Sequence, residues 1–267
     1  MLISLPDPQL LEIAGADAVN FAHAQFSSDV RALENGRWQW SAWLSPQGRV
    51  RTFFGLVRDS NERLRLLLRG GRAEKLRAAL APYVMRAKVN LRVLDEVHVL
   101  GTDEAQPGAL DLPGTPPRWL ILGSGAGHAD ASPQARQIWR LADIRAGLPE
   151  LNDNLADQLL PQWLGLDRLG AVSVKKGCYP GQEVMSRLHF KGGNKRSLYR
   201  LELGADAACA TTLTTASGEA AGQIVMTAPR DTERYEALAT LTDALAAAPL
   251  HAENAVSAGA SVLERFR

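Results

Sequence analysis

The chain has 267 residues, of which 46% are hydrophobic and 22% are charged, and its formal net charge is +1. These are globular averages, so composition predicts a folded chain with ample core and argues against disorder. A net charge so close to zero argues against binding of nucleic acid by overall electrostatic attraction. A local basic patch is still compatible with this net charge. The two cysteines, Cys178 and Cys209, indicate no disulfide framework and cannot alone complete a four-ligand iron–sulfur site.

The first residues lack the basic segment and apolar run of a secretory signal, and no apolar run approaches the roughly 18–20 residues that a membrane span needs. The sequence therefore predicts a cytoplasmic protein with no membrane partner.

The first hundred residues predict strands interleaved with helices. Asp17 is expected to cap a helix that begins at Ala18, and apolar residues at helical spacing predict a second helix over 72–84. Alternating or apolar runs predict the strands, at 10–15, 38–44, 50–57, 64–68 and 89–99.

Residues 103–117 are rich in proline, glycine and aspartate and predict a linker or long surface loop. The pattern then repeats weakly, with a strand at 119–122, a glycine-rich turn at 123–129 and a helix at 134–142 whose apolar positions are Ile138 and Leu141. Strands and helices interleaved twice indicate two α+β sandwiches of the split βαβ type.

After Lys195 the sequence consists of short segments in which apolar and polar residues alternate. These segments predict strands at 197–203 and 222–226. Residues 235–248 are ambiguous, because propensity favours a helix for the alanines whereas 236–241 also fits a strand. The predicted organisation is a first α+β subdomain over 1–110, a second over 111–195 interleaved with it, and a small C-terminal β module over 196–267.

The sharpest motif is the segment 176–183, which reads Lys-Gly-Cys-Tyr-Pro-Gly-Gln-Glu. It resembles the signature Lys-Gly-Cys-aromatic-x-Gly-Gln-Glu of the YgfZ family, relatives of the glycine-cleavage T-protein, at every fixed position. The likeness spans roughly residues 10–200 and fades in the C-terminal module. Supporting matches lie at 26–30, 46–49, 160–162 and 195–196.

The resemblance implies an α+β fold of two ferredoxin-like subdomains and a small C-terminal β-barrel-like module, arranged around a central folate cavity. It implies tetrahydrofolate or a one-carbon derivative as cofactor. It also implies a role in maintaining iron–sulfur enzymes, including one that modifies tRNA, with those enzymes as client partners. A monomer is expected.

Cys178 is the candidate working thiol, and Lys176 is assigned to the catalytic group with it. Nearby Lys175 and Lys176 and a helix expected to begin near Gly181 would stabilise a thiolate and lower the thiol pKa below about 8.5. The alternative is that Cys178 is a small buried hydrophobic residue.

The turn before that helix suits type II geometry, with Pro180 and Gly181 at its two central positions. Glu183 could accept hydrogen bonds from a pterin, or could simply pair with Arg187 one helical turn away. The resemblance places Gln182 and Glu183 among the folate-binding residues.

Trp139 matches a tryptophan of the family and could stack on a pterin or aminobenzoyl ring, or could be a core aromatic. The family's partner aromatic is missing, because Pro8 stands near its place. Asp29, Arg49 and Arg145 occupy motif positions. Either arginine could hold the folate's carboxylates, and an ordinary ion pair is the alternative.

A basic stretch with interleaved aromatics runs over 187–200 and could contact RNA. A solvated basic face, or a lip that attracts polyglutamyl folate, is the favoured interpretation, so direct nucleic-acid binding is not expected. The glycines of 123–127 lack the Lys-Ser/Thr ending of a phosphate loop, and the histidines show no metal-binding spacing.

Two other activities remain as alternatives. One is a folate-dependent one-carbon transferase. The transferase relatives place a pair of aspartates in the stretch that the resemblance matches to residues 47–53, where no carboxylate occurs here, so general-base work at that place is not available and enzymatic activity is left open. A Cys–His hydrolase would need His189 or His23 to reach Cys178.

Overall fold

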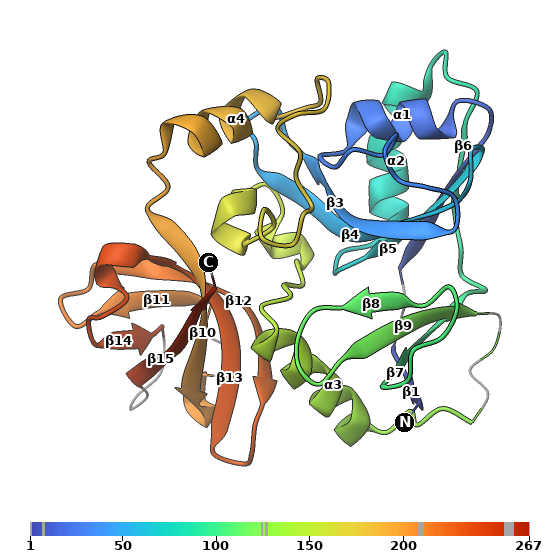
Figure 1. The fold of residues 1–267 in the computed structure, drawn as a ribbon. Coiled ribbons are helices and arrows are strands. Elements are labelled where there is room, and N and C mark those ends of the chain that lie inside the picture. The colour runs from blue at the N-terminus through green and yellow to red at the C-terminus, as the bar shows by residue number, and fades with distance from the viewer. Residues whose placement is uncertain are drawn as a thin grey trace.

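The structure, a computed structural model, describes residues 2–6, 9–123, 125, 128–207, 211–253 and 259–266. The strands form three groups, seen as three lobes in Figure 1: a five-stranded sheet, a four-stranded sheet and a closed barrel. All three are built from antiparallel pairs of strands. The mixed α/β class predicted from the sequence is confirmed, as is the C-terminal β-barrel.

The first lobe is a five-stranded sheet covered on one face by two helices. Phe26 and Phe54 meet edge to face between helix and sheet, with ring centroids 4.9 Å apart, and both are fully buried. The sheet order is β3-β4-β5-β2-β6. The elements are β2 Leu10–Ala14, α1 Ala18–Gln25, β3 Arg37–Leu44, β4 Val50–Ser60, β5 Arg63–Leu68, α2 Ala73–Val84 and β6 Asn90–Val93.

The second lobe is a four-stranded sheet of order β1-β7-β9-β8 with one long helix, α3. This helix starts where the sequence allows it to: the Ser132 hydroxyl accepts a hydrogen bond from the Ala135 backbone, and Pro133 fills the first helical position. The elements are β1 Leu2–Ser4, β7 His98–Thr102, β8 Leu110–Leu112, β9 Arg118–Gly123 and α3 Pro133–Arg145.

The third lobe is a closed barrel of order β10-β13-β12-β11-β14-β15. Short 3₁₀ turns η1 Asp153–Leu155 and η2 Pro161–Leu164, and the helix α4 Gln182–Lys191, connect α3 to it. Its elements are β10 Arg196–Gly204, η3 Ala205–Ala207, β11 Thr212–Thr215, β12 Ala220–Pro229, β13 Arg234–Thr242, η4 Asp243–Leu245, β14 Leu250–Ala252 and β15 Gly259–Phe266.

One hydrophobic cluster joins the three lobes. It contains Phe53 from the first sheet, Leu120 from the second, Leu164 from η2, and Leu198 and Leu238 from the barrel. Separate clusters lie between the first sheet and its helices and inside the barrel. Because the lobes share a core, contacts between them are part of the fold.

The helix favoured by propensity within 235–248 is wrong, because β13 runs over Arg234–Thr242. Its alanines Ala237 and Ala239 pack inside the barrel, whereas Leu238 packs in the cluster shared by the lobes. A strand buried on both faces shows no alternation, and this removed the period-2 signal from the sequence.

Two other expectations change. The single strand expected over 89–99 is two strands, β6 and β7, which belong to different sheets. The loop expected over 103–117 contains β8, whose Asp111 accepts a hydrogen bond from the Trp38 indole at 2.9 Å.

Two side chains also differ from expectation. Asp17 precedes α1 but does not cap it with its side chain; its carboxylate accepts the backbone N–H of Lys88 at 2.8 Å. Ile138, expected in the core, is 53% exposed, and Ala135 and Trp139 lie on the buried side of α3 instead.

Candidate functional site

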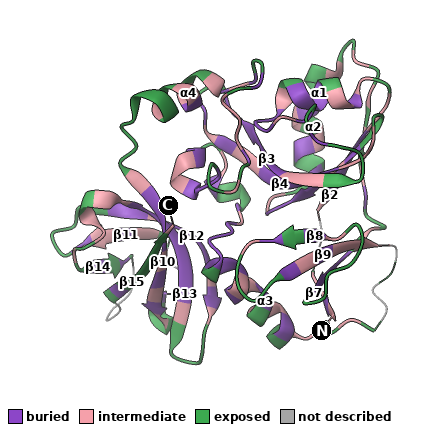
Figure 2. Cartoon of the chain, in the orientation of Figure 1, coloured by how far each residue is buried: buried purple, intermediate pink, exposed green. Residues whose placement is uncertain are grey.

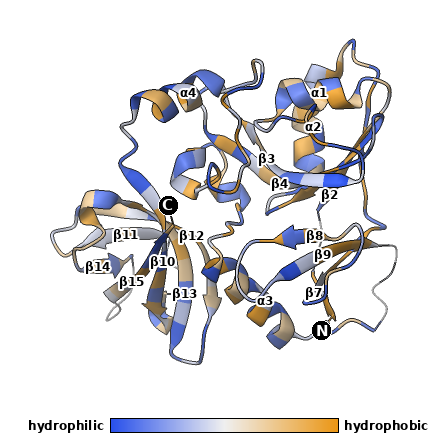
Figure 3. Ribbon diagram, in the orientation of Figure 1, coloured by the Kyte–Doolittle hydropathy of each residue, from blue (hydrophilic) through white to orange (hydrophobic). Residues whose placement is uncertain are grey.

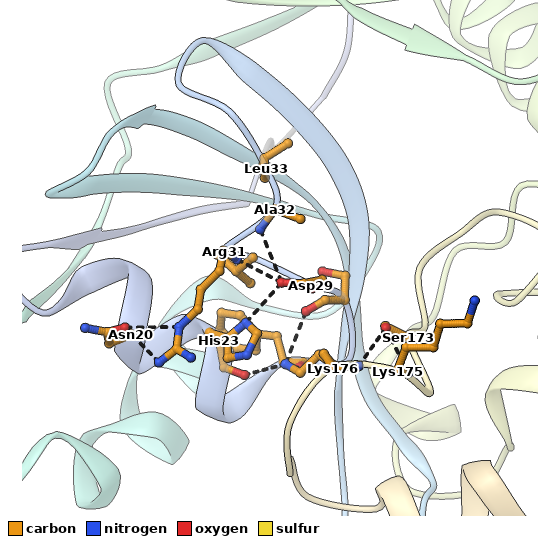
Figure 4. Close-up of polar contacts among 12 residues, drawn as sticks. Asn20, His23, Asp29, Arg31, Ala32, Leu33, Ser173, Lys175 and Lys176 are labelled. Atoms are coloured by element: carbon orange, nitrogen blue, oxygen red, sulfur yellow. Dashed lines mark hydrogen bonds and ion pairs between the residues drawn. The ribbon is translucent and has the colours of Figure 1, made fainter.

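The ammonium group of Lys176 is buried against the end of helix α1 (Figure 4). It donates hydrogen bonds to the backbone carbonyls of His23, Phe26 and Ser28, the last two at 2.5 and 3.2 Å. Carbonyls at a helix C-terminus lack intrahelical donors and carry partial negative charge, so a lysine there both caps the helix and is stabilised by it. Lys176 therefore fastens its loop to α1.

Several further hydrogen bonds fix the same loop. The backbone N–H of Ser173 donates to the carbonyl of Ser27 at 2.8 Å, and the Tyr179 hydroxyl donates to the carbonyl of Ser173 at 3.0 Å. The Gln182 amide donates to the Lys176 carbonyl at 3.0 Å. Burial raises the pKa of Tyr179 to about 12, which keeps the phenol protonated as a donor.

The turn between the loop and α4 has the geometry expected from its sequence. Gly181 has φ 81° and ψ −1°, and the Gln182 N–H donates to the Tyr179 carbonyl at 3.2 Å, as in a type II turn. A Cβ at Gly181 would lie 2.6 Å from the carbonyl oxygen of Ser45 and 2.7 Å from the Cα of Gly48. The segments 26–30, 46–49 and 176–183 thus meet in space.

Cys178 is exposed on this loop. Lys175 is also exposed, whereas the Lys176 ammonium is turned into its carbonyl cage and is not free to act beside the thiol. Cys209 lies outside the described residues. Within the described part of the chain, no hydrogen bond joins Cys178 to His23 or His189.

Asp29 lies at the edge of the same cage (Figure 4). Its carboxylate accepts the backbone N–H groups of Arg31 and Ala32 at 3.1 and 3.2 Å, and it lies 3.4 Å from the Nδ1 of His23. Burial and the nearby Lys176 charge lower the pKa of His23, and Asp29 opposes them. Asp29 is thus a local capping residue of the 29–32 turn.

A separate cleft of about 820 Å³ lies between the first two lobes. Leu67 and Arg69 of the first lobe line one side, and Val99, Leu120 and Trp139 of the second line the other. Pockets that hold drug-sized ligands have volumes of about 300–1,000 Å³, so the cleft is large enough for a cofactor. Of the residues predicted for the site, Trp139 lines it.

The polar part of the cleft comes mainly from one face of α3. Arg136, Trp139, Arg140 and Asp143 stand at helical spacing and all line the cleft. Arg140 pairs with Glu150 at 2.8 Å, and the Arg136 Nε donates to the Ser4 carbonyl at 3.2 Å. One helix face therefore presents an aromatic ring between charged groups.

Asp143 is a buried carboxylate held by two buried guanidinium groups. Its oxygens lie 2.8 Å from Nη2 of Arg69 and 2.9 Å from Nη1 of Arg118. Burial alone would lower the pKa of Arg69, but the carboxylates of Asp143 and Glu150 outweigh it and raise that pKa. The Asp143 group thus ties the first lobe to α3 at the base of the cleft.

Trp139 is clamped in place. Its ring lies 4.7 Å from the Arg118 guanidinium, and a Cβ at Gly101 would lie 2.5 Å from the ring, so only glycine leaves room for the indole. The indole Nε1 of Trp139 and the Nε of Arg69 are buried without a hydrogen-bond partner. Most buried polar atoms in proteins have partners, and these two unpaired donors belong to residues that line the cleft.

The other predicted residues lie elsewhere. The Arg145 guanidinium pairs with Glu236 of the barrel at 2.5 Å. Arg49 donates to the Gln158 carbonyl and lies 5.1 Å from the ring of Trp163. Glu183 is exposed in the first turn of α4, and the ion pair with Arg187 that was the alternative to pterin binding is not formed between these two described residues.

Sequence reasoning missed Arg69, Arg118 and Asp143. The sequence did contain a pattern that could have identified Asp143. Its carboxylate lies one helical turn after Trp139 on a helix face that is buried, and a buried carboxylate needs a cationic partner. The two arginines come from strand ends far away in the chain, and only the tertiary fold identifies them as that partner.

The described residues contain no group of three or more side chains suited to holding a metal ion. Among them, no helix is both long enough and apolar enough to cross a membrane.

Comparison with known proteins gives the family. An uncharacterized protein of Haemophilus influenzae is 31% identical and aligns over 74% of this chain and 71% of its own length. Proteins named tRNA-modifying protein YgfZ from Cronobacter sakazakii and Escherichia coli O157:H7 are 29% and 28% identical over 75% of the chain. This chain belongs to the YgfZ family.

The YgfZ signature is thus the loop fastened by Lys176. No family model matches the chain. The fold is similar to that of the glycine cleavage system aminomethyltransferase T from Bartonella henselae, with a TM-score of 0.69 over 98% of this chain and 84% of that one, at 15% identity.

Replacing Lys176 by methionine should lower the free energy of unfolding by about 3 kcal/mol, because three carbonyls lose their donor and each unsatisfied buried group costs ~1–3 kcal/mol. Burial lowers the pKa of Lys176 to about 8. Between pH 8 and about 10.5 the unfolded chain would hold a proton that the folded chain lacks, so this residue's contribution to stability rises with pH. The loss in Lys176→Met should therefore be larger at pH 10 than at pH 7, as measured by urea denaturation.

Lys175→Met is the matched control, since the neighbouring lysine is exposed and its substitution should change stability by less than about 0.5 kcal/mol. Equal losses in the two variants would contradict the carbonyl cage. A Lys176→Met loss that does not grow between pH 7 and pH 10 would show instead that the carbonyls offset burial and that the Lys176 pKa is not lowered.

Proposed function

We propose that this YgfZ-family protein binds tetrahydrofolate or a one-carbon derivative in the cleft between the first two lobes. We further propose that it supports iron–sulfur enzymes, among them enzymes that modify tRNA, through the Cys178 thiol. The observation that carries the folate part is the cleft itself, with its clamped Trp139 and its buried donors without partners.

The chemistry of the cleft fits a folate. A pterin or aminobenzoyl ring is flat and apolar on its faces, and the Trp139 ring offers a matching wall. The edge of a pterin both donates and accepts hydrogen bonds, which suits the Trp139 Nε1 and the Arg69 Nε as donors. When bound, a reduced folate would supply one-carbon chemistry; the chain's own residues bind and orient it.

Arg72 is the candidate for the folate's carboxylate end. It lines the cleft, is exposed, and forms no ion pair or hydrogen bond through its side chain with any residue that the structure describes. A free guanidinium can bind a carboxylate through two parallel hydrogen bonds. Arg136 and Arg140 add positive charge on the facing helix.

The folate-binding residues proposed here differ from most of those predicted from the sequence. Asp29, Arg49, Arg145, Gln182 and Glu183 do not line the cleft. The proposal keeps two ferredoxin-like subdomains around a folate cavity, with the C-terminal module beginning near residue 195. The limit predicted near residue 110 moves to the segment between β6 and β7, because β1 and β7 pair within the second sheet. A cytoplasmic monomer remains part of it.

The thiol part rests on the loop. Cys178 is exposed, whereas Lys176, Tyr179 and Gln182 are each engaged in holding the loop. A thiol held on a fixed loop and open to solvent is suited to redox or nucleophilic work on another molecule. The relatives' name, tRNA-modifying protein, agrees with a client that acts on tRNA. The one-carbon transferase alternative gains no support, because residues 47–53 carry no carboxylate.

Arg72→Ala should raise the dissociation constant for tetrahydrofolate about tenfold or more, with an unchanged melting temperature, because the exposed side chain forms no hydrogen bond or ion pair with any described residue. Titration calorimetry with tetrahydrofolate measures it, and Arg37→Ala, which removes an exposed arginine of the same lobe outside the cleft, is the control. No heat with any reduced folate would refute the binding proposal.

Trp139 needs a gentler change, since it is 6% exposed and its truncation to alanine would cost about 3–5 kcal/mol of stability. Trp139→Phe keeps an aromatic wall and removes Nε1, so it should weaken folate binding severalfold with a smaller loss of stability. Unchanged affinity would show that the indole donor does not face the ligand.

Cys178→Ala should abolish support of iron–sulfur enzymes while fold and folate affinity stay near those of the wild type, because an exposed thiol contributes little to packing. The measurement is iron–sulfur enzyme activity, or the tRNA modification that depends on it, in a strain lacking its own copy. Full rescue by Cys178→Ala would show that the thiol has no working role.

A further inference from the structure

Helix α4 and the loop after it carry an uncompensated positive charge. Residues 184–201 contain no aspartate or glutamate, whereas Arg187, Lys191 and Lys195 project from this segment as exposed side chains. None of the three forms an ion pair with any residue in the described ranges. A chain with a net charge of +1 thus concentrates unpaired cations in one place.

Several arginines elsewhere in the described residues have acidic partners, whereas Arg37, Arg72 and Arg86 do not. The stretch 187–195 differs in that it holds three exposed, unpaired cations and no acidic residue. Arg51 pairs with Asp157 at 3.0 Å, and Arg65 pairs with Asp59 at 2.6 Å. Cations that the fold leaves unpaired and close together repel one another, and an acidic partner would relieve that repulsion.

An exposed aromatic ring lies among these cations. Phe190 is 73% exposed, and its ring contacts that of His189 edge to face at 4.9 Å. Met185 is the one fully buried residue of α4, and the helix lies at the edge of the molecule with mixed hydropathy (Figures 2 and 3). An apolar ring surrounded by cations is typical of a protein-binding hot spot, in which aromatic and arginine side chains dominate.

The helix is also held in a fixed relation to the thiol. Cys178 precedes α4 by one tight turn, and the Gln182 side chain at the first position of α4 is bonded to the Lys176 carbonyl. Phe190 lies about 12 Å of helix rise from Gln182, so a partner of protein size seated on α4 would extend to the exposed Cys178.

We propose that the exposed face formed by Arg187, Phe190, Lys191 and Lys195, here called the α4 face, docks an acidic surface of the iron–sulfur client protein and presents it to Cys178. The inference rests on the proposed function and assigns its partner-binding surface.

RNA fits this face less well than an acidic protein does. Proteins that bind single strands offer a series of aromatic platforms along a basic groove. Here Phe190 is an exposed ring, whereas Trp163 has the guanidinium groups of Arg49 and Arg196 at 5.1 and 5.0 Å from its ring. A single apolar side chain among cations suits a pocket on an acidic protein surface.

The test places the photo-crosslinking residue p-benzoylphenylalanine at position 190 of the full chain in cells. The control carries it at position 83, where Tyr83 is 49% exposed on the first lobe. We expect a protein adduct specific to position 190, identified by mass spectrometry as an iron–sulfur protein with an acidic surface. Nuclease-sensitive adducts, adducts with proteins that carry no cluster, or no adduct above the control would overturn the proposal.

Charge variants give the second measurement. Arg187→Glu, Lys191→Glu and Lys195→Glu together should lower the adduct yield and the client's activity at least tenfold. The matched triple Arg37→Glu, Arg86→Glu and Lys88→Glu changes exposed cations of the first lobe by the same net charge and should lower neither. Glutamine at 187, 191 and 195 should give a smaller loss in the same direction, which guards against a simple disruption of α4 by acidic residues near its C-terminus.

Failure of this inference is distinguishable from failure of the proposed function. If the wild-type protein supports the client and Cys178→Ala does not, but the α4 triple behaves like its matched control, the docking inference falls and the thiol proposal stands. If the wild-type protein supports no iron–sulfur enzyme, the proposed function itself falls.

Discussion

The burial of one lysine ammonium group organises the signature segment of this protein. An ammonium removed from water needs acceptors, and Lys176 finds them in the carbonyls at the end of α1, which themselves lack donors. The tyrosine and glutamine that follow in the motif bond back to the same loop. Once these residues are assigned to holding the backbone, the exposed cysteine is the member of the segment with nucleophilic chemistry that is left open to another molecule.

Helix α3 has the same importance for the cleft that Lys176 has for the loop. Its cleft side carries Trp139 and Asp143, while Gln137 and Arg140 donate to barrel carbonyls of Pro229 and Thr227 at 2.7 and 2.8 Å. At its end Arg145 pairs with a buried barrel glutamate. The helix is therefore fixed from the barrel side, so that its cleft side presents a preorganised wall, and preorganisation reduces the ordering cost of binding.

The sequence predicted well what is local. The type II turn, the start of α4 and most strands of the first lobe follow from periodicity and from glycine and proline chemistry. Prediction failed where burial in the tertiary structure determines the secondary structure. The strand β13 is buried on both faces and shows no alternation of apolar and polar residues. The apolar run over 89–99 divides between two sheets. The sequence also could not show that Lys176 points away from the thiol, because the carbonyls that attract it lie about 150 residues earlier in the chain.

The residues that line the cleft include none of those that fix the Cys178 loop. A flat cofactor needs an apolar wall and buried donors, whereas a thiol that serves another protein needs exposure and a docking surface. These demands conflict at a single site, since burial that strengthens hydrogen bonding would also close the thiol to a large partner. Separate sites on a shared hydrophobic core meet both demands. Trp139 of the cleft, and Tyr179 and Met185 on either side of the loop's turn, belong to the same hydrophobic cluster, so both sites depend on the packing of one core.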